Sequence, residues 1–289
     1  MFGFVNASKP VGPTSHDVVA RVRRMLPRRT RVGHAGTLDP FASGVLVLCI
    51  GPATRLAEYV QRAPKRYRAV VRLGAVSSTG DRHGELARTA GAQPPSQAAL
   101  ATVLARFVGE IEQVPPAHSA VKVAGRRAYK LARRGEEFAL APRTVTVHGL
   151  DAIRYEWPEL EIDVRCGSGT YIRALARDLG AALGVGGYCD ALERTAVGAF
   201  VIEDAVAAGD VDFARDLQTP LTALAGLPRV EASAQEVVAL RYGQPIERDG
   251  LPAGTEAAVT DPGGKLVAVC RIAGDRRLKP AKVFPAAQP

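Results

Sequence analysis

Six consecutive apolar residues, 45–50, leave this part of the chain little choice of structure, because they must be buried. Glycines at 44 and 51 bound the run, which predicts a buried β-strand. Over residues 67–73 apolar and basic residues alternate, which predicts a half-buried strand with a basic outer face. Helices are expected over residues 15–25, 96–108 and 170–183 and from about Pro52, and a further strand is expected over 160–164. The sequence therefore predicts a mixed α/β fold.

The composition is that of a folded globular protein with a basic surface. Of 289 residues, 47% are hydrophobic and 23% are charged, which excludes a disordered or collagen-like chain. The formal net charge of +9 favours a polyanionic partner, with nucleic acid as the first candidate. Basic residues cluster over 9–31, 62–72 and 122–134. Because a nucleic-acid backbone requires several spaced cations, three clusters favour a phosphate-binding surface over three unrelated solvated faces.

The cysteines and the N-terminus bear on the compartment. The four cysteines contain no C-x-x-C pair, so they indicate neither a zinc signature nor a disulfide framework. The first residues lack the features of a signal peptide, and the longest apolar run is too short to span a bilayer. We expect a cytoplasmic protein that does not associate with membranes.

Residues 227–289 differ from the rest of the chain. Pro228 stands at their start, a short helix is predicted over 233–242, and apolar strands are predicted near 257–260 and 266–272. We expect this segment to form a small, separate, β-rich domain.

A glycine-punctuated loop, residues 33–46, leads directly into the buried strand and contains a single carboxylate, Asp39. Pro40 biases Asp39 away from the helical region, and the glycines allow close approach of a ligand. The loop can therefore project Asp39 into a site. On the Asp-Pro dipeptide alone, a structural Asx turn is the favoured interpretation of Asp39.

Two further segments contain candidate site residues. Arg173 falls in the first turn of a predicted helix, where a cation is unfavourable, so we expect it to have an acidic partner. Tyr67 lies among Lys65, Arg66 and Arg68, and an aromatic ring among cations suits stacking on a base. A tyrosine on a strand is more commonly a core residue.

Together these segments resemble the TruB family of tRNA pseudouridine-55 synthases along nearly the whole chain. The segments that carry the resemblance are KPVGPTS at 9–15, the loop 33–46, KRY at 65–67, GTYIR at 169–173, LERT at 192–195 and, more loosely, 263–280. The stretch from Pro115 resembles an insertion near 115–142 that grips RNA, with His118 where the family pattern has an aromatic residue.

The resemblance implies a fold and an activity. The fold would be α/β (α+β), with a mixed, largely antiparallel sheet in a catalytic domain over 1–226 and a small PUA-like domain over 227–289. The activity would be the isomerisation of uridine to pseudouridine at position 55 in the T-arm of tRNA, with flipping of the target base. The reaction is an isomerisation, so no cofactor or metal is expected. The partner would be the T-arm stem-loop of tRNA, and no obligate protein partner is evident.

The resemblance also assigns roles to residues. Asp39 would be the catalytic nucleophile or base, Arg173 would pair with it, and Tyr67 would lie against the flipped base with its hydroxyl available for proton transfer. Attack by the carboxylate and deprotonation of the sugar to a glycal both remain open. The residues expected to bind RNA are His34, Tyr171, Leu192, Lys9, Lys65, Lys122, Arg126 and Arg127.

Two other classes of function compete with this interpretation. A non-catalytic RNA-binding or RNA-folding protein would explain the basic clusters equally well, although it has no need of Asp39, Tyr67 and Arg173. A nucleoside or glycoside hydrolase would commonly use two carboxylates, and the loop around Asp39 contains only one.

Overall fold

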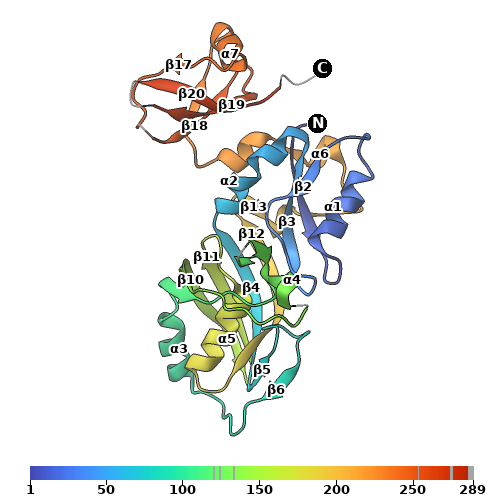
Figure 1. Cartoon of the computed structure of the whole chain (residues 1–289), viewed down its shortest axis with the longest axis vertical. Coiled ribbons are helices and arrows are strands. Elements are labelled where there is room, and N and C mark those ends of the chain that lie inside the picture. The colour runs from blue at the N-terminus through green and yellow to red at the C-terminus, as the bar shows by residue number, and fades with distance from the viewer. Residues whose placement is uncertain (120, 124, 133, 253, 274–275, 286–289) are drawn as a thin grey trace.

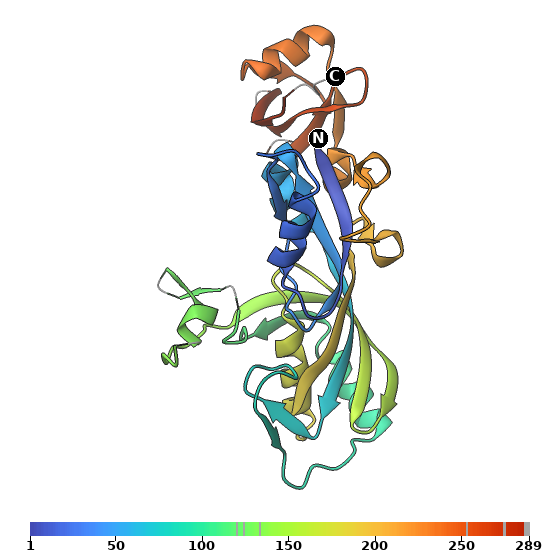
Figure 2. The same cartoon turned by 90° about the vertical axis from the view of Figure 1, so that its right-hand side faces the viewer.

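The computed structural model describes residues 1–119, 121–123, 125–132, 134–252, 254–273 and 276–285 (Figure 1). Over these residues the strands form two main sheets. A long sheet passes through both halves of the body, and a smaller sheet lies at the C-terminal end of the molecule (Figures 1 and 2).

The large sheet is mostly antiparallel, and parallel pairs occur only between β1 and β14 and between β3 and β12 in the described chain. Its strands follow one another in the order β14 (Val206–Ala207), β1 (Gly3–Lys9), β3 (Ser43–Ile50), β12 (Gly187–Val197), β4 (Lys65–Leu73), β11 (Glu159–Cys166), β10 (Arg143–Glu156) and β7 (Gly109–Gln113). Three short strands extend it at the sides, β2 (Val32–His34) on β3, β13 (Phe200–Val201) on β12 and β15 (Leu217–Gln218) on β1. The predicted α/β class with a mixed, largely antiparallel sheet is confirmed.

Strand β12 joins the two halves of the sheet. It pairs in parallel with the start of β3 and antiparallel with β4 along most of its length. Gly44 faces Arg194 at the β3 pairing, where its φ is +104° and a Cβ would lie 2.2 Å from the Arg194 carbonyl oxygen. Only glycine permits this close approach, which brings the loop before β3 against β12.

Helices cover both faces of the sheet, as the alternation of side chains requires. Helix α1 (Ser15–Arg23), which is capped by Thr14, packs Val18, Val19 and Val22 against one face of β1 and β3. The opposite face is covered by the 3₁₀ segments Gly51–Leu56 and Pro220–Leu224 and by residues near α2 (Ala57–Arg62). In the other half of the sheet, α3 (Gln97–Ala105) and α5 (Ile172–Ala182) pack on β4, β10 and β11.

Between β7 and β10 the chain forms a small unit that extends away from the body, as Figure 2 shows. It contains the hairpin β8 (Lys122–Val123) and β9 (Arg126–Arg127) and the short helix α4 (Ala128–Ala132). The predicted insertion near 115–142 corresponds to this segment. A second hairpin, β5 (Ala75–Ser77) and β6 (Leu86–Arg88), lies at the far end of the body from the C-terminus (Figure 1).

The C-terminal sheet has its own core. Its strands follow the order β16 (Arg229–Glu231), β18 (Glu256–Thr260), β19 (Leu266–Ile272), β20 (Arg277–Val283) and β17 (Ile246–Glu247), covered by α7 (Ala234–Arg241). It meets the body where Phe284 stacks on Phe2 with ring centroids 5.0 Å apart and where Lys282 pairs with Glu58. A domain boundary between 226 and 227 stays a prediction. No helix in the described ranges is both long and apolar enough to cross a membrane.

Candidate active site

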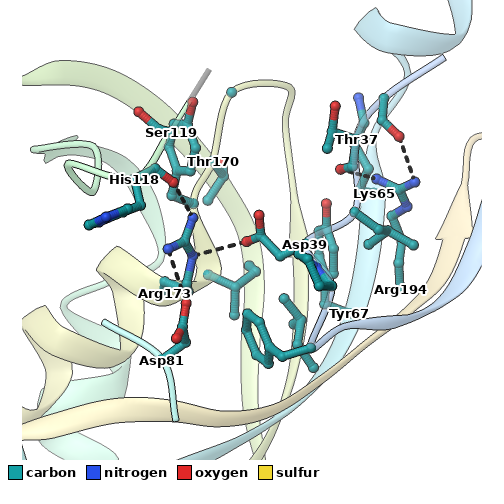
Figure 3. Close-up of a pocket in the computed structure, with 18 of the residues that line it drawn as sticks. Thr37, Asp39, Lys65, Tyr67, Asp81, His118, Ser119, Thr170, Arg173 and Arg194 are labelled. Atoms are coloured by element: carbon teal, nitrogen blue, oxygen red, sulfur yellow. Dashed lines mark hydrogen bonds and ion pairs between the residues drawn. The ribbon is translucent and has the colours of Figure 1, made fainter. Parts of the chain in front are cut away.

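A cavity of about 730 Å³ lies between the two halves of the large sheet and brings together distant parts of the chain. It is lined by the loop that carries Asp39, by β4, by the start of α5, by β12, by the turn between β5 and β6, and by the insertion. Figure 3 shows the polar side chains of these segments converging on the space beside Asp39.

The guanidinium of Arg173 organises one wall of this cavity. Its Nε lies 3.0 Å from Oδ2 of Asp39, and its Nη1 lies 3.1 Å from Oδ2 of Asp81. The remaining donations go to backbone oxygens, from Nη1 to Thr79 at 3.0 Å and from Nη2 to His118 at 2.7 Å. Arg173 is only 5% exposed, whereas the Asp39 side chain is 36% exposed. The predicted acidic partner of Arg173 is therefore present, and its orientation leaves Asp39 open to the cavity.

Asp81 is a second acidic partner that the sequence did not indicate. It lies in the turn between β5 and β6, where its Oδ1 accepts hydrogen bonds from Thr79 Oγ1 at 2.8 Å and from the backbone N–H of His83 at 3.0 Å. Its other oxygen is the one bound to Arg173. The second carboxylate that a hydrolase would require is thus buried and already paired, which weakens that alternative.

The charge of Asp39 is set by opposing effects. Burial raises the pKa of its carboxyl group, and the Arg173 guanidinium opposes this by favouring the ionised form. Asp81 raises the same pKa and Lys9 lowers it, and the net direction is upward. Asp39 is therefore a partly desolvated carboxylate held beside a cation, an arrangement typical of groups that act in catalysis.

Lys9 lies beneath the loop rather than on the surface. Its side chain is completely buried, and its ammonium donates to the carbonyl oxygens of Ala42 at 2.6 Å and Pro10 at 2.8 Å. Burial lowers its pKa to about 8. The predicted RNA contact of Lys9 does not agree with this position, because no part of the side chain reaches the surface. Lys9 instead ties the end of β1 to the loop that carries Asp39.

Arg194 holds the same loop through contacts to other backbone carbonyls. It is 2% exposed and donates from Nε to the carbonyl of Val45 at 2.8 Å and from Nη2 to that of Gly36 at 3.1 Å. A longer contact from Nη1 reaches the Thr37 carbonyl at 3.4 Å (Figure 3). The sequence placed Arg194 in a motif but gave it no role, and only its buried position on β12 reveals one.

Tyr67 comes from β4 and lines the cavity while being only 9% exposed. Burial raises the pKa of its hydroxyl, and the neighbouring Arg194 guanidinium acts in the opposite direction. The residue is therefore both a core residue, as its strand position predicts, and a neighbour of Asp39 in the cavity wall.

Three of the residues expected to bind RNA also line the cavity, namely Lys65, Tyr171 and Leu192. Lys65 donates to the Ala63 carbonyl at 2.7 Å, and burial lowers its pKa to about 8. The backbone N–H of Tyr171 donates to the Gln113 side chain at 2.8 Å, which fixes the start of α5.

The other expected RNA contacts lie outside the cavity. His34 is on β2, and burial lowers the pKa of its imidazole. Lys122, Arg126 and Arg127 lie on the β8–β9 hairpin, where Arg126 pairs with Glu136 at 2.7 Å. The side chains of Lys122 and Arg127 are not among the described parts of the structure.

Comparisons with known proteins show the family to which the chain is related. Residues 23–172 match the family described as TruB family pseudouridylate synthase (N terminal domain), and residues 227–285 match tRNA Pseudouridine synthase II, C terminal. The chain is 44% identical to tRNA pseudouridine synthase B of Arthrobacter sp. (strain FB24), over 98% of this chain and 96% of that protein. It is also 44% identical to the protein of that name from Mycobacterium leprae (strain TN), over 95% and 88%.

Two solved structures are similar to this chain over nearly its whole length. A structure of a Cbf5-Nop10-Gar1 complex matches with a TM-score of 0.76 and 27% identity, covering 100% of this chain and 85% of the other. An H/ACA RNP bound to a substrate RNA containing 2′-deoxyuridine matches with a TM-score of 0.75 and 26% identity, over 99% and 86%. With sequence matches that span nearly its whole length, the chain belongs to the TruB family of pseudouridylate synthases.

Proposed function

We propose that this protein converts uridine to pseudouridine at position 55 in the T-arm of tRNA, with Asp39 as the catalytic carboxylate. The observation that carries the proposal is the contact of 3.0 Å between Asp39 and the buried Arg173 at the edge of an open cavity. The names of the relatives, tRNA pseudouridine synthase B, support tRNA as the substrate. The net charge of +9 suits the same partner.

The reaction breaks the bond between N1 of the base and C1′ of the ribose, turns the base, and joins C5 to C1′. All other atoms are retained: C5 loses its proton when it joins C1′, and the freed N1 gains a proton. Ionised Asp39 starts the reaction by attack or by removal of a sugar proton, and both routes need it charged and oriented. Arg173 supplies both conditions.

The target base must leave the folded arm to reach Asp39. Extrusion of a base costs a few kcal/mol, which stacking and backbone contacts offset. Tyr67, Tyr171 and Leu192 provide aromatic and apolar surface in the cavity wall for the flipped base. The Tyr67 hydroxyl is in turn available for the proton transfer at C5.

The test is to incubate the purified protein with an unmodified tRNA transcript and map pseudouridine at each position, in parallel with Asp39→Asn. We expect one pseudouridine in the T-arm with the wild type and none with the variant. The variant should still bind the transcript and unfold at a similar temperature. Wild-type protein that binds the transcript but forms no pseudouridine would overturn the proposal in favour of a non-catalytic RNA-binding protein.

A further inference from the structure

The three basic clusters of the sequence differ in what neutralises them. On β4, the outward arginines face acids of the neighbouring strand β11. Arg66 pairs with Asp163 at 2.9 Å, Arg68 lies 3.6 Å from Glu161, and Arg72 pairs with Glu159. The basic face predicted for this strand is thus largely compensated within the protein.

The insertion is partly compensated in the same way. Glu136 lies 2.7 Å from Arg126 and 3.8 Å from Arg134. An RNA phosphate that bound these arginines would have to compete with a carboxylate already in place.

The connection between α1 and β2 is different. It carries four exposed arginines, and Arg23, also exposed, ends α1 just before it. None of these five has a carboxylate partner among the described residues. The single side-chain hydrogen bond found for them there runs from Arg23 Nη2 to the Val32 carbonyl at 2.9 Å. These residues surround a hollow of about 720 Å³, which we call the arginine hollow. It is lined by Arg23, Arg24, Leu26, Pro27, Arg28, Arg29, Thr30, Arg31, Val32 and Thr54.

A structural role explains only part of this cluster. Arg23 lies in the last turn of α1 and Arg24 is its C-cap, so both interact favourably with the negative end of the helix dipole. That effect is confined to the last turn. Arg28, Arg29 and Arg31 lie beyond it, and the helix gives no reason for their charge.

The backbone at Arg29 supplies an independent observation. Its φ is +74°, in the left-handed region that favours glycine and is strained for a residue with a long side chain. Backbone strain of this kind clusters at catalytic and ligand-binding sites, where the surrounding structure holds it in place. Here the side chain lines the hollow.

The arginine hollow is close to the active site along the chain. Val32 lines the hollow and begins β2, whereas Ala35 and Gly36, just beyond the end of β2, line the catalytic cavity. A strand of three residues spans about 10 Å, so one RNA molecule can reach both sites. In Figure 1 the connection from α1 to β2 lies toward the C-terminal sheet, away from β5 and β6.

We propose that the arginine hollow binds the sugar–phosphate backbone of the substrate RNA outside the nucleotides that enter the cavity. The proposal rests on the proposed function only in naming tRNA as that RNA. Guanidinium groups bind phosphate oxygens through paired, charge-assisted hydrogen bonds, which suits a backbone contact. Such contacts fix the register of the RNA on the protein and read no bases.

The experiment compares two double variants that lose the same charge. Arg28→Gln with Arg29→Gln removes two cations of the hollow, and Arg68→Gln with Arg72→Gln removes two compensated cations of β4. Binding of a fluorescent tRNA transcript is measured by anisotropy between about 50 and 200 mM KCl. For the hollow variant we expect the slope of log Kd against log salt to fall by about 1.8, at roughly 0.9 per phosphate contact. At fixed salt Kd should rise roughly tenfold, while the β4 variant retains the wild-type values.

Two further variants separate binding from folding. The double variant Arg28→Lys with Arg29→Lys should have the wild-type slope of log Kd against log salt, because it keeps both positive charges. Arg29→Gly should unfold at no lower temperature than wild type, since it relieves the left-handed φ, yet it should lose about one unit of slope.

Equal losses in the two double variants would mean that net charge alone sets the affinity, and would overturn the proposal. An unchanged slope in the hollow variant would also overturn it, while pseudouridine formation by the wild type would leave the proposed function standing. If the wild type formed no pseudouridine, the proposed function would fail, and the comparison of slopes would still decide whether the hollow binds RNA.

Discussion

Replacing Arg173 by lysine keeps the positive charge but removes the planar set of donors with which the guanidinium binds several acceptors at once. The guanidinium serves four acceptors from three nitrogens, two of them the carboxylates of Asp39 and Asp81. A lysine ammonium is a single point of charge and cannot reach both carboxylates at once. Because the site is 5% exposed at Arg173, a lost charged hydrogen bond to the buried Asp81 should cost about 1.5–3 kcal/mol of the free energy of unfolding. The pairing with Asp39 contributes less to stability, since that carboxylate is more exposed.

The same substitution should affect catalysis more than stability. A displaced Asp39 carboxylate should lower the single-turnover rate of pseudouridine formation by about 10²-fold. Arg173 lowers the pKa of Asp39, so weakening the contact raises that pKa further. The acid limb of the rate profile should then move to higher pH, because Asp39 is protonated and inactive over a wider range.

The assay is release of tritium from C5-labelled uridine in tRNA under single-turnover conditions, measured across a pH series. Arg177→Lys is the matched control, since Arg177 lies one turn later on α5 and its side chain is 40% exposed. We expect the control to retain the rate and the pH profile. An Arg173→Lys protein with the wild-type rate and an unmoved acid limb would refute the assigned role of the guanidinium.

Three further outcomes are expected. Burial lowers the pKa of Lys9 to about 8, so above that pH the folded protein loses the Lys9 proton while the unfolded chain keeps it. The free energy of unfolding of the wild type should therefore rise relative to that of Lys9→Met as the pH increases above about 8. Urea titrations at several pH values check this. Burial raises the pKa of Cys49 to about 12 and of Cys166 to about 11, so mass spectrometry should find them alkylated by iodoacetamide only after denaturation. Charge reversal at Arg126 and Arg127 should weaken tRNA binding and flatten its salt dependence, and an unchanged salt slope would contradict this.

Helices and strands whose apolar residues recur at a regular spacing could be predicted from the sequence. The run 45–50 forms the buried core of β3, and the alternation at 67–73 falls within β4. The helix expected over 15–25 is α1, ending two residues earlier than predicted. The helix expected from Pro52 begins instead as a 3₁₀ segment, because the chain turns at Gly51, whose φ is +60°. Local patterns carry this information, because the hydrophobic period reflects which face is buried.

Residues of the candidate site could be predicted only where a residue type was unusual for its place in a predicted element. A cation in the first turn of a helix signals an acidic partner, which led to Arg173. Asp81 lies 92 residues away from it in a turn without a periodic pattern, so only the tertiary structure brings them together. Lys9 was misplaced because lysines are rarely buried fully, and its burial depends on the carbonyl of Ala42, 33 residues along the chain.

The two buried cations that hold the loop, Lys9 and Arg194, bind main-chain oxygens. Every residue type offers the same carbonyl, so the anchoring does not depend on which side chains the loop carries. Apart from Gly44 and the buried Leu38, the loop can therefore exchange side chains around Asp39 without losing these anchors. The exposed side chain of Thr37, which lines the cavity, is therefore a suitable starting point for its redesign, whereas the neighbouring Phe41 belongs to the buried core.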